Sequence, residues 1–136
     1  MLGLKEAGTT EEDTNATTPV IVLVSCPVDL RPEEARRLSG RLNVEINPKS
    51  LSFQAYGKRK VSEVYNCNYE LNPEFRGRFE AANLTIGGTG DNGEVRIIEL
   101  PDHRFFLATA FQPQMSSTRE RPHPLFVAYL RACAQP

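Results

Sequence analysis

The segment VRIIELPDHRFFLATAFQPQ, residues 95–114, carries the clearest structural signal in the chain. Two runs of strand-forming residues, Val95 to Glu99 and Phe105 to Phe111, flank the polar break Leu100 to Arg104. Apolar runs on both sides of a break rich in turn-forming residues are typical of two paired strands. We therefore expect a β-hairpin across this segment.

The length and composition are those of one globular domain. The chain has 136 residues, and its 16 Lys and Arg nearly balance its 17 Asp and Glu. A net charge near zero creates no strong field toward nucleic acid or an anionic membrane. No apolar run approaches a membrane-spanning length, and residues 1–15 lack the apolar segment of a signal peptide. We expect no nucleic-acid partner and no membrane insertion, and the oligomeric state stays open.

Further strand-like segments follow one another along the chain, joined by turns. Residues 1–18 are polar and rich in Thr and Glu, so we expect a flexible N-terminal arm there. Residues 31–38 form either a short helix or a polar loop. Residues 125–132 could be a strand or two helical turns, and their length and aromatic content favour a strand. The expected strands are residues 20–25, 42–46, 51–55, 61–71, 78–86, 95–99, 105–111 and 125–132.

The order of these segments indicates an antiparallel fold. About eight short strands in hairpin order, with no long helix between them, argue against a parallel sheet with crossover helices. An antiparallel barrel or sandwich remains. Eight strands in meander order can close into a barrel, which removes the sheet edges and leaves room for one small ligand.

Several segments resemble the lipocalin family. Cys67 to Leu71 is similar to the family's fourth strand, Val95 to Glu99 with Phe105 to Phe111 to its sixth and seventh, and Phe126 to Arg131 to its eighth. The chain departs from the family because it has no Trp for the Gly-x-Trp signature, and no helix follows the last strand. The resemblance implies an all-β fold, an eight-stranded antiparallel up-and-down barrel over residues 19–136 with one short helix at most.

A lipocalin-like barrel implies binding and transport of a small hydrophobic ligand. Burial of apolar surface would hold the ligand, with Thr109 and Tyr129 as hydrogen-bonding groups. The alternative is a β-rich interaction module whose core the same side chains fill, acting through loops such as residues 112–124. The expected ligand-lining residues are Leu42, Val44, Ile46, Phe53, Phe79, Val95, Ile97, Phe105, Leu107, Thr109, Phe111, Leu125, Val127 and Tyr129.

Three cysteines, Cys26, Cys67 and Cys133, allow one disulfide and a free thiol, or three reduced thiols. The resemblance implies a Cys67–Cys133 disulfide and an extracellular, secreted protein whose signal peptide is not present in this chain. In a secreted protein, the Asn-x-Thr triplets at Asn15 and Asn83 would be glycosylation sites.

The chain shows few patterns of catalysis. Its two histidines, His103 and His123, lie in turn or loop segments without a Ser or Cys partner at a recognisable spacing. Gly87 to Gly93 lacks the Gly-Lys-Ser/Thr ending of a phosphate loop, and the cysteine spacing fits no zinc signature. We expect no enzymatic activity, no cofactor and no metal.

Overall fold

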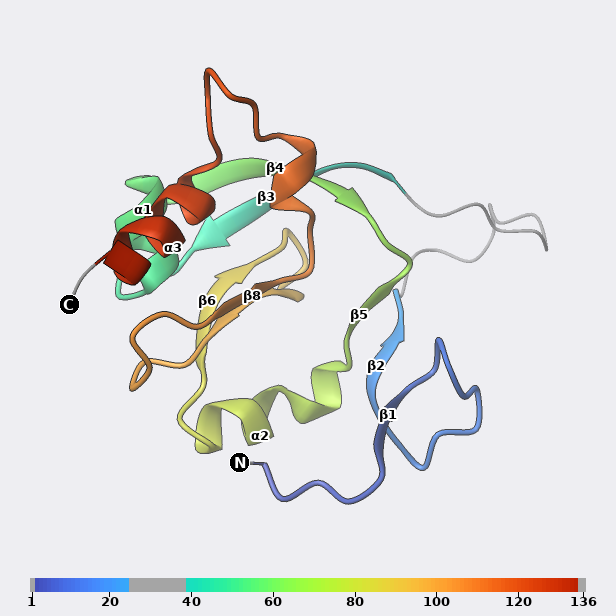
Figure 1. Ribbon diagram of the computed structural model, residues 1–136. Helices are drawn as coiled ribbons and strands as arrows, with labels where there is room; N and C mark the ends of the chain where they lie inside the picture. The colour runs from blue at the N-terminus through green and yellow to red at the C-terminus, as the bar shows by residue number, and fades with distance from the viewer. Residues whose placement is uncertain (1, 25–38, 135–136) are drawn as a thin grey trace.

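The computed structural model describes residues 2–24 and 39–134, so the expected helix or loop at residues 31–38 and Cys26 lie outside the described residues. Its strands are β1 (Ala7–Thr9), β2 (Thr18–Leu23), β3 (Ser39–Ile46), β4 (Lys60–Asn66), β5 (Tyr69–Leu71), β6 (Thr85–Thr89), β7 (Val95–Glu99) and β8 (Leu107–Thr109). Its helices are α1 (Leu51–Tyr56), α2 (Arg76–Ala81) and α3 (Pro124–Ala134), with the short 3-10 helices η2 (Pro73–Phe75) and η3 (Pro113–Met115). Figure 1 shows α1 and α3 together at one end of the molecule and α2 toward the other.

The strands form two sheets and do not close into a barrel. The five-stranded sheet has the order β4-β3-β6-β7-β8, and the three-stranded sheet has the order β1-β2-β5. β4 and β8 are the outer strands of the larger sheet and do not pair with each other, although Gln112, which follows β8, donates its N–H to the carbonyl of Val64 on β4 at 3.0 Å. β1 and β2 run parallel, whereas the pairs of the larger sheet are antiparallel. The expected all-β, up-and-down barrel is therefore wrong, and the fold combines helices with mixed sheets.

The hairpin expected within residues 95–111 is confirmed. β7 pairs with β8 in antiparallel register, with Ile97 opposite Thr109 and Glu99 opposite Leu107. The backbone N–H of Leu100 donates to the carbonyl of Phe106 at 3.3 Å and closes the polar break. β8 ends early because the chain turns away into η3, which begins at a proline that has no N–H for a sheet ladder.

The strand expected at residues 51–55 is wrong, because this segment is helix α1. The hydroxyl of Ser50 accepts the N–H of Phe53 at 3.0 Å at the start of the helix. Gly57 ends it with a left-handed φ of 64° and donates its N–H to the carbonyl of Phe53 at 2.8 Å. A capping serine and a left-handed glycine favour a helix between them. These two caps outweigh an alternating apolar pattern that spans only a few residues.

The strand favoured at residues 125–132 is also wrong, because this segment lies in α3. The helix begins at Pro124, where the fixed φ of proline suits the first helical position. The ring Nδ1 of His123 accepts the N–H of Leu125 at 3.3 Å, and the carbonyl of His123 accepts the N–H of Val127 at 3.2 Å. Residues 78–86, expected to be extended, likewise begin in α2 and enter β6 only at Thr85.

One apolar core lies between the larger sheet and the pair α1 and α3. Alternate residues of β3 and β7 point into it, as the period of two requires. Its buried cluster consists of Val44, Ile46, Ile97, Phe111 and Leu125.

The N-terminal residues contribute to the smaller sheet. Residues 7–9, within the arm expected to be flexible, form β1 and pair with β2. The expected boundary between residues 18 and 19 falls inside β2. The structure thus places part of the arm in the fold.

Candidate functional site

The residues expected to line a barrel cavity lie mostly in the packed core, and the open sheet provides no barrel interior. The buried cluster contains Val44, Ile46, Ile97, Phe111 and Leu125, and the side chains packed against it include Leu42, Phe53 and Leu107. Of the other expected lining residues, Phe79 and Val95 are buried outside this cluster. The half-buried ones are Phe105, Thr109 and Val127. Tyr129 is 51% exposed on α3, so it cannot be a hydrogen-bonding group inside a cavity.

The expected disulfide is not formed, because Cys67 and Cys133 are both free. Cys67 is half-buried in the connection between β4 and β5, and Cys133 is exposed near the end of α3. Asn15 and Asn83 are exposed, and the side-chain amide of Asn83 donates to Asp102 at 2.6 Å. Their glycosylation was predicted only for a secreted protein.

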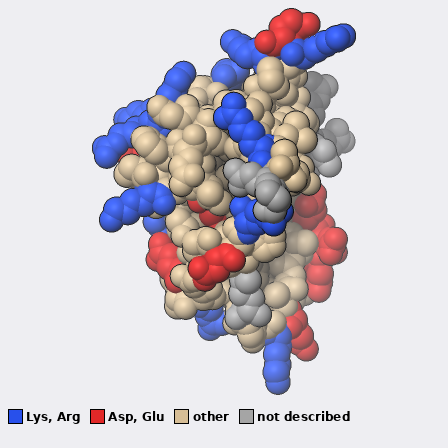
Figure 2. Space-filling view, turned by 60° about the vertical axis from the view of Figure 1, so that its left-hand side comes forward, with Lys and Arg blue, Asp and Glu red and all other residues tan. Residues whose placement is uncertain are grey.

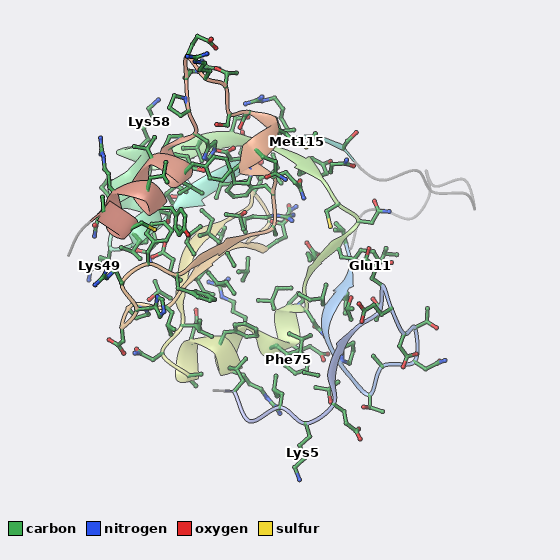
Figure 3. The ribbon with its side chains drawn as sticks, in the orientation of Figure 1. Lys5, Glu11, Lys49, Lys58, Phe75 and Met115 are labelled. Atoms are coloured by element: carbon green, nitrogen blue, oxygen red, sulfur yellow. The ribbon has the colours of Figure 1, made fainter. Side chains whose placement is uncertain are left out.

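A cleft of about 290 Å³ opens where β3, β7 and the β4–β5 connection meet. We call it the polar cleft, and the side chains that define it are Arg41, Asn43, Tyr65, Cys67, Tyr69, Asp91, Glu94 and Arg96. An adjoining apolar cleft of about 290 Å³ shares Cys67, Tyr69 and Arg96 with it. Glu11, labelled beside β2 in Figure 3, is one of the residues that line the apolar cleft.

Arg96 lies at the boundary of the two clefts and is nearly buried, with 10% of its side chain exposed. Its Nη2 lies 3.1 Å from Oε1 of Glu94 and 3.5 Å from Oε2 of Glu70. Its Nε is buried and has no hydrogen-bond partner among the described residues. Buried donors without partners are rare in native proteins. Arg96 is therefore held in place by two carboxylates while part of its guanidinium stays unused.

Glu94 is held in its ionised form. Burial on its own raises the pKa of this carboxyl, but the backbone N–H groups of Glu94 and Asn92, together with Arg96, outweigh burial and lower the pKa. The N–H of Asn92 donates to Oε2 at 3.0 Å. A Cβ on Gly90 would collide with the Glu94 carboxylate and lie 3.2 Å from Nε of Arg96, so a side chain there would displace this carboxylate.

Arg41 and Asp91 form a second pair of opposite charges at the rim of the polar cleft. Arg41 donates from Nη2 to the carbonyl of Ser62 at 2.8 Å, and Asn43 donates to Oδ2 of Asp91 at 3.0 Å. Within the described parts of the chain, the hydroxyls of Tyr65 and Tyr69 make no hydrogen bond. The cleft thus combines charges of both signs with unused hydroxyl groups.

Cys67 brings a thiol to both clefts, and its sulfur accepts the N–H of Tyr69 at 3.4 Å. A thiol acts as a nucleophile when a neighbouring base takes its proton. His103 instead contacts the carbonyl of Phe105 at 3.1 Å through Nδ1, and His123 contacts Glu63. Across residues 2–24 and 39–134, neither histidine contacts a cysteine.

A separate polar cluster joins β4, α1 and the start of α3. The hydroxyl of Tyr56 donates to Oε1 of Glu63 at 2.7 Å, and Nε2 of His123 lies 3.1 Å from Oε2. Because Nδ1 of His123 accepts the N–H of Leu125, the proton lies on Nε2 and is donated to Glu63. Burial raises the pKa of Glu63, but the hydrogen bonds from His123 and Tyr56 outweigh it and lower the pKa. Burial, followed by the neighbouring Glu63, raises the pKa of Tyr56.

Figure 2 shows basic and acidic side chains interspersed on one face, with basic side chains more numerous in its upper part and acidic ones in its lower part. The described residues contain no group of three His, Cys, Asp or Glu side chains placed to hold a metal ion. No helix among them is long and apolar enough to cross a membrane.

Comparison with solved structures identifies the class of the fold. The chain matches the glutaminase domain of Trypanosoma brucei CTP synthase, solved with bound acivicin, with a TM-score of 0.87 and 27% identity. This match covers 98% of our chain and 53% of that chain. A GMP synthase protein from Thermoplasma acidophilum shares the fold alone, at a TM-score of 0.57 and 15% identity. The chain therefore matches about half of a glutaminase domain, which has an α/β fold.

Comparison with curated sequences likewise finds CTP synthases among the proteins similar to this chain. The CTP synthase of Saccharolobus solfataricus is 34% identical over 134 residues, which cover 98% of our chain and 25% of that enzyme. The CTP synthase of Archaeoglobus fulgidus is 37% identical over 133 residues, which cover 97% of our chain and 25% of that enzyme. The chain thus spans about a quarter of the length of these relatives. No protein-family model matches it.

These findings overturn the resemblance to lipocalins. The similar proteins are enzymes, and the matched structure is a glutaminase domain. The expectations of ligand transport, of a hydrophobic ligand as partner, of secretion and of a protein without enzymatic activity are therefore wrong. The alternative of an interaction module with a filled core is not supported either.

The sequence reasoning missed the polar cleft because its residues come from separate segments. One signal was present, since Arg96 interrupts the otherwise apolar strand Val95 to Ile98. Val95 and Ile97 are buried on one face, so a charge between them marks the opposite face. The acidic turn Asp91 to Glu94 precedes it directly. Together these residues could have indicated a polar site at the start of β7.

Proposed function

We propose that this chain is a glutamine amidotransferase-type domain that takes up glutamine for release of its side-chain amide nitrogen, as part of a CTP-synthase-like protein. The observation that carries the proposal is the TM-score of 0.87 to a glutaminase domain over 98% of the chain. The similarity to CTP synthases at 34% and 37% identity supports the same class. Because the chain spans 25% of those enzymes, the proposal concerns glutamine and not the synthesis of CTP.

The polar cleft is the site that we assign to glutamine. Its volume of about 290 Å³ lies near the lower end of ligand pockets, which suits a molecule of amino-acid size. Its charged and hydroxyl groups suit a polar, zwitterionic ligand. The core beneath the sheet, by contrast, is filled by apolar side chains.

Release of the amide nitrogen breaks the C–N bond of the carboxamide and joins its carbonyl carbon to a nucleophile. Water then completes hydrolysis to glutamate and ammonia. Cys67 is the described cysteine that lines the polar cleft, whereas Cys133 is exposed on α3. Since neither histidine contacts Cys67 in the described residues, we place this thiol in the site and assign no base to it.

Calorimetric titration of the purified chain with glutamine tests the proposal, together with an assay for ammonia in the same samples. We expect saturable binding of glutamine and release of ammonia. Cys67→Ser should reduce the release, and the matched variant Cys133→Ser should not. A folded chain, verified by circular dichroism, that binds no glutamine contradicts the proposal.

A further inference from the structure

We propose that the outer side of α3, with the groove beside it, is the interface of a homodimer in which two copies of this chain pack their α3 helices antiparallel. Figure 1 shows α3 at an outer end of the molecule, so a second copy has access to it. The inference does not involve glutamine, and it goes beyond the proposed function.

Helix α3 has an apolar inner side that packs against the core. Leu125 is 4% exposed, and Ala128 and Ala132, three and seven positions later, are half-buried. Residues at this spacing share one side of a helix. These three positions account for the packing of α3 on α1 and the larger sheet.

A second apolar stripe runs along the outer side of α3. It consists of Phe126, Tyr129, Leu130 and Cys133. Their spacing of three, four and seven positions is that of a helix which packs against another helix. Phe126 is 38% exposed, Tyr129 51% and Leu130 64%, and Cys133 is exposed as well. Large apolar side chains gathered on one exposed side of a helix mark an interaction surface.

A groove of about 280 Å³ lies beside this outer stripe. Its walls include Phe105 and Leu107 from the β7–β8 hairpin, and Phe126 and Tyr129 from the stripe. The rings of Phe105 and Tyr129 meet edge to face at 5.6 Å, which joins the hairpin to the helix. The same surface therefore carries a recess and, next to it, the projecting side chain of Leu130.

A surface with both a projection and a recess is complementary to itself. In a twofold interface the same surface lies on both sides, and each contact occurs twice. Two antiparallel α3 helices centred between Tyr129 and Leu130 place Leu130 of each copy against Tyr129 of the other. Leu130 of each copy then enters the groove of the other copy, because Tyr129 is part of the groove wall.

The charges of the chain favour a second copy as the partner. The 16 Lys and Arg nearly balance the 17 Asp and Glu, so two copies repel each other only weakly. Arg131 is the one charged residue of α3, and at 3.6 residues per turn it lies roughly 150° from the centre of the outer stripe. No like charges therefore meet at the centre of the interface. Antiparallel helices also bring the positive end of one helix dipole beside the negative end of the other.

The exposed area predicts a weak dimer. An aromatic side chain buries about 150–250 Å² in total. Phe126, Tyr129 and Leu130 expose between 38% and 64% of their surface. Each therefore supplies on the order of 100 Å². With Cys133 and the groove walls, two copies bury on the order of 1,000 Å², which is the lower end of specific interfaces. We expect a dissociation constant in the micromolar range, so the dimer depends on protein concentration.

Sedimentation analysis of the purified chain over a series of concentrations tests the association. We expect the mass to rise from that of one chain toward that of two. Leu130→Glu places a charge at the centre of the interface and should weaken association at least ~10-fold. The matched control is Leu23→Glu, the same change at a leucine that is 48% exposed in β2, and it should associate like the unchanged chain. Circular dichroism verifies that each variant is folded.

A disulfide tests the antiparallel arrangement. Positions 126 and 133 of one helix lie about 10 Å apart, which is too far for a disulfide within one chain. The antiparallel arrangement instead places position 126 opposite Cys133 of the second copy. With oxidised glutathione, Phe126→Cys should form a disulfide-linked dimer on a non-reducing gel. The double variant Phe126→Cys with Cys133→Ser is the control and should form far less of it.

The outcomes decide the proposal without reference to glutamine. A folded chain that stays monomeric at the highest concentration overturns it, and so does equal association of Leu130→Glu and Leu23→Glu. A dimer in which Phe126→Cys forms no disulfide with Cys133 overturns the antiparallel arrangement. The proposed function is tested by glutamine binding and ammonia release, so it stands or fails separately from these results.

Discussion

Glu99 connects the larger sheet to helix α1 through one buried carboxylate. It is 2% exposed, and its two oxygens accept the N–H of Leu51 at 2.7 Å and the N–H of Ser52 at 2.8 Å. The first N–H groups of a helix have no partner within the helix, so they depend on such acceptors. A Cβ on Gly87 would collide with this carboxylate, which explains the glycine opposite it.

We expect Glu99→Ala to lower the free energy of unfolding by ~3 kcal/mol, because two buried N–H groups lose their acceptor. Glu99→Gln should cost less, since its amide oxygen can still accept one of them. Urea denaturation measures both changes. Glu120→Ala, in an exposed loop, is the control and should leave the midpoint nearly unchanged. Equal midpoints for Glu99→Ala and the control would contradict the role of Glu99.

The sequence patterns predicted the burial of apolar residues better than the burial of polar residues. Val44 and Ile46 alternate with polar neighbours, and both are buried as the period of two implies. Glu63 and Glu99 are also buried, although acidic residues are rarely found there without partners. Their partners, such as His123 for Glu63, lie far away in sequence, so no local pattern indicated their burial.

At the level of elements, the errors concern short apolar runs that fit both a strand and a helix. Residues 51–55 and 125–132 were expected as strands and form α1 and α3. The end signals Ser50, Gly57 and Pro124 were present in the sequence and mark helix ends. A prediction that gave these helix-end residues more weight than strand propensity would have placed both helices.

The contact between Glu63 on β4 and His123 at the start of α3 predicts a dependence of stability on pH. The pKa of Glu63 is lowered from 4.5 in the folded protein, so its stabilising contribution is complete above about pH 4.5. It is lost as the pH falls through the lowered value. We expect the melting temperature to fall more steeply below about pH 4.5 in the unchanged chain than in Glu63→Gln.

Thermal melts across this pH range measure the effect. Glu80→Gln is a suitable control, because Glu80 is an exposed acid paired with Arg76 at 3.4 Å and surface pairs contribute little. Its pH profile should match that of the unchanged chain. Parallel profiles for Glu63→Gln and the unchanged chain would show that the cluster does not act through ionisation of Glu63.

At the scale of the whole molecule, the two sheets differ in how they are stabilised. The buried apolar side chains of the described residues lie in or beside the larger sheet, and none belongs to β1, β2 or β5. The smaller sheet is held mainly by backbone hydrogen bonds and half-buried side chains. Apolar burial is the main stabilising contribution in folding, so the smaller sheet is the less stable part.

Hydrogen exchange should resolve this difference. We expect the amides of β1 and β2 to exchange faster than those of β3 and β7, because local opening exposes less apolar surface in the smaller sheet. Mass spectrometry of peptides from the exchanged protein measures both sheets in one experiment, and α2 serves as an internal reference. Equal protection of the two sheets would mean that they unfold as one unit.

The sequence of this protein was sufficient to predict those features that depend on residues close together in the chain. The β7–β8 hairpin and the alternating core face of β3 follow from periodicity and turn chemistry, which act over a few residues. The order of strands, the open sheets and the polar cleft depend on contacts between distant segments, such as Arg96 with Glu70 and Glu99 with Leu51. Such contacts form only when the folded chain excludes water and brings charges within hydrogen-bonding distance, and no local pattern contains that information.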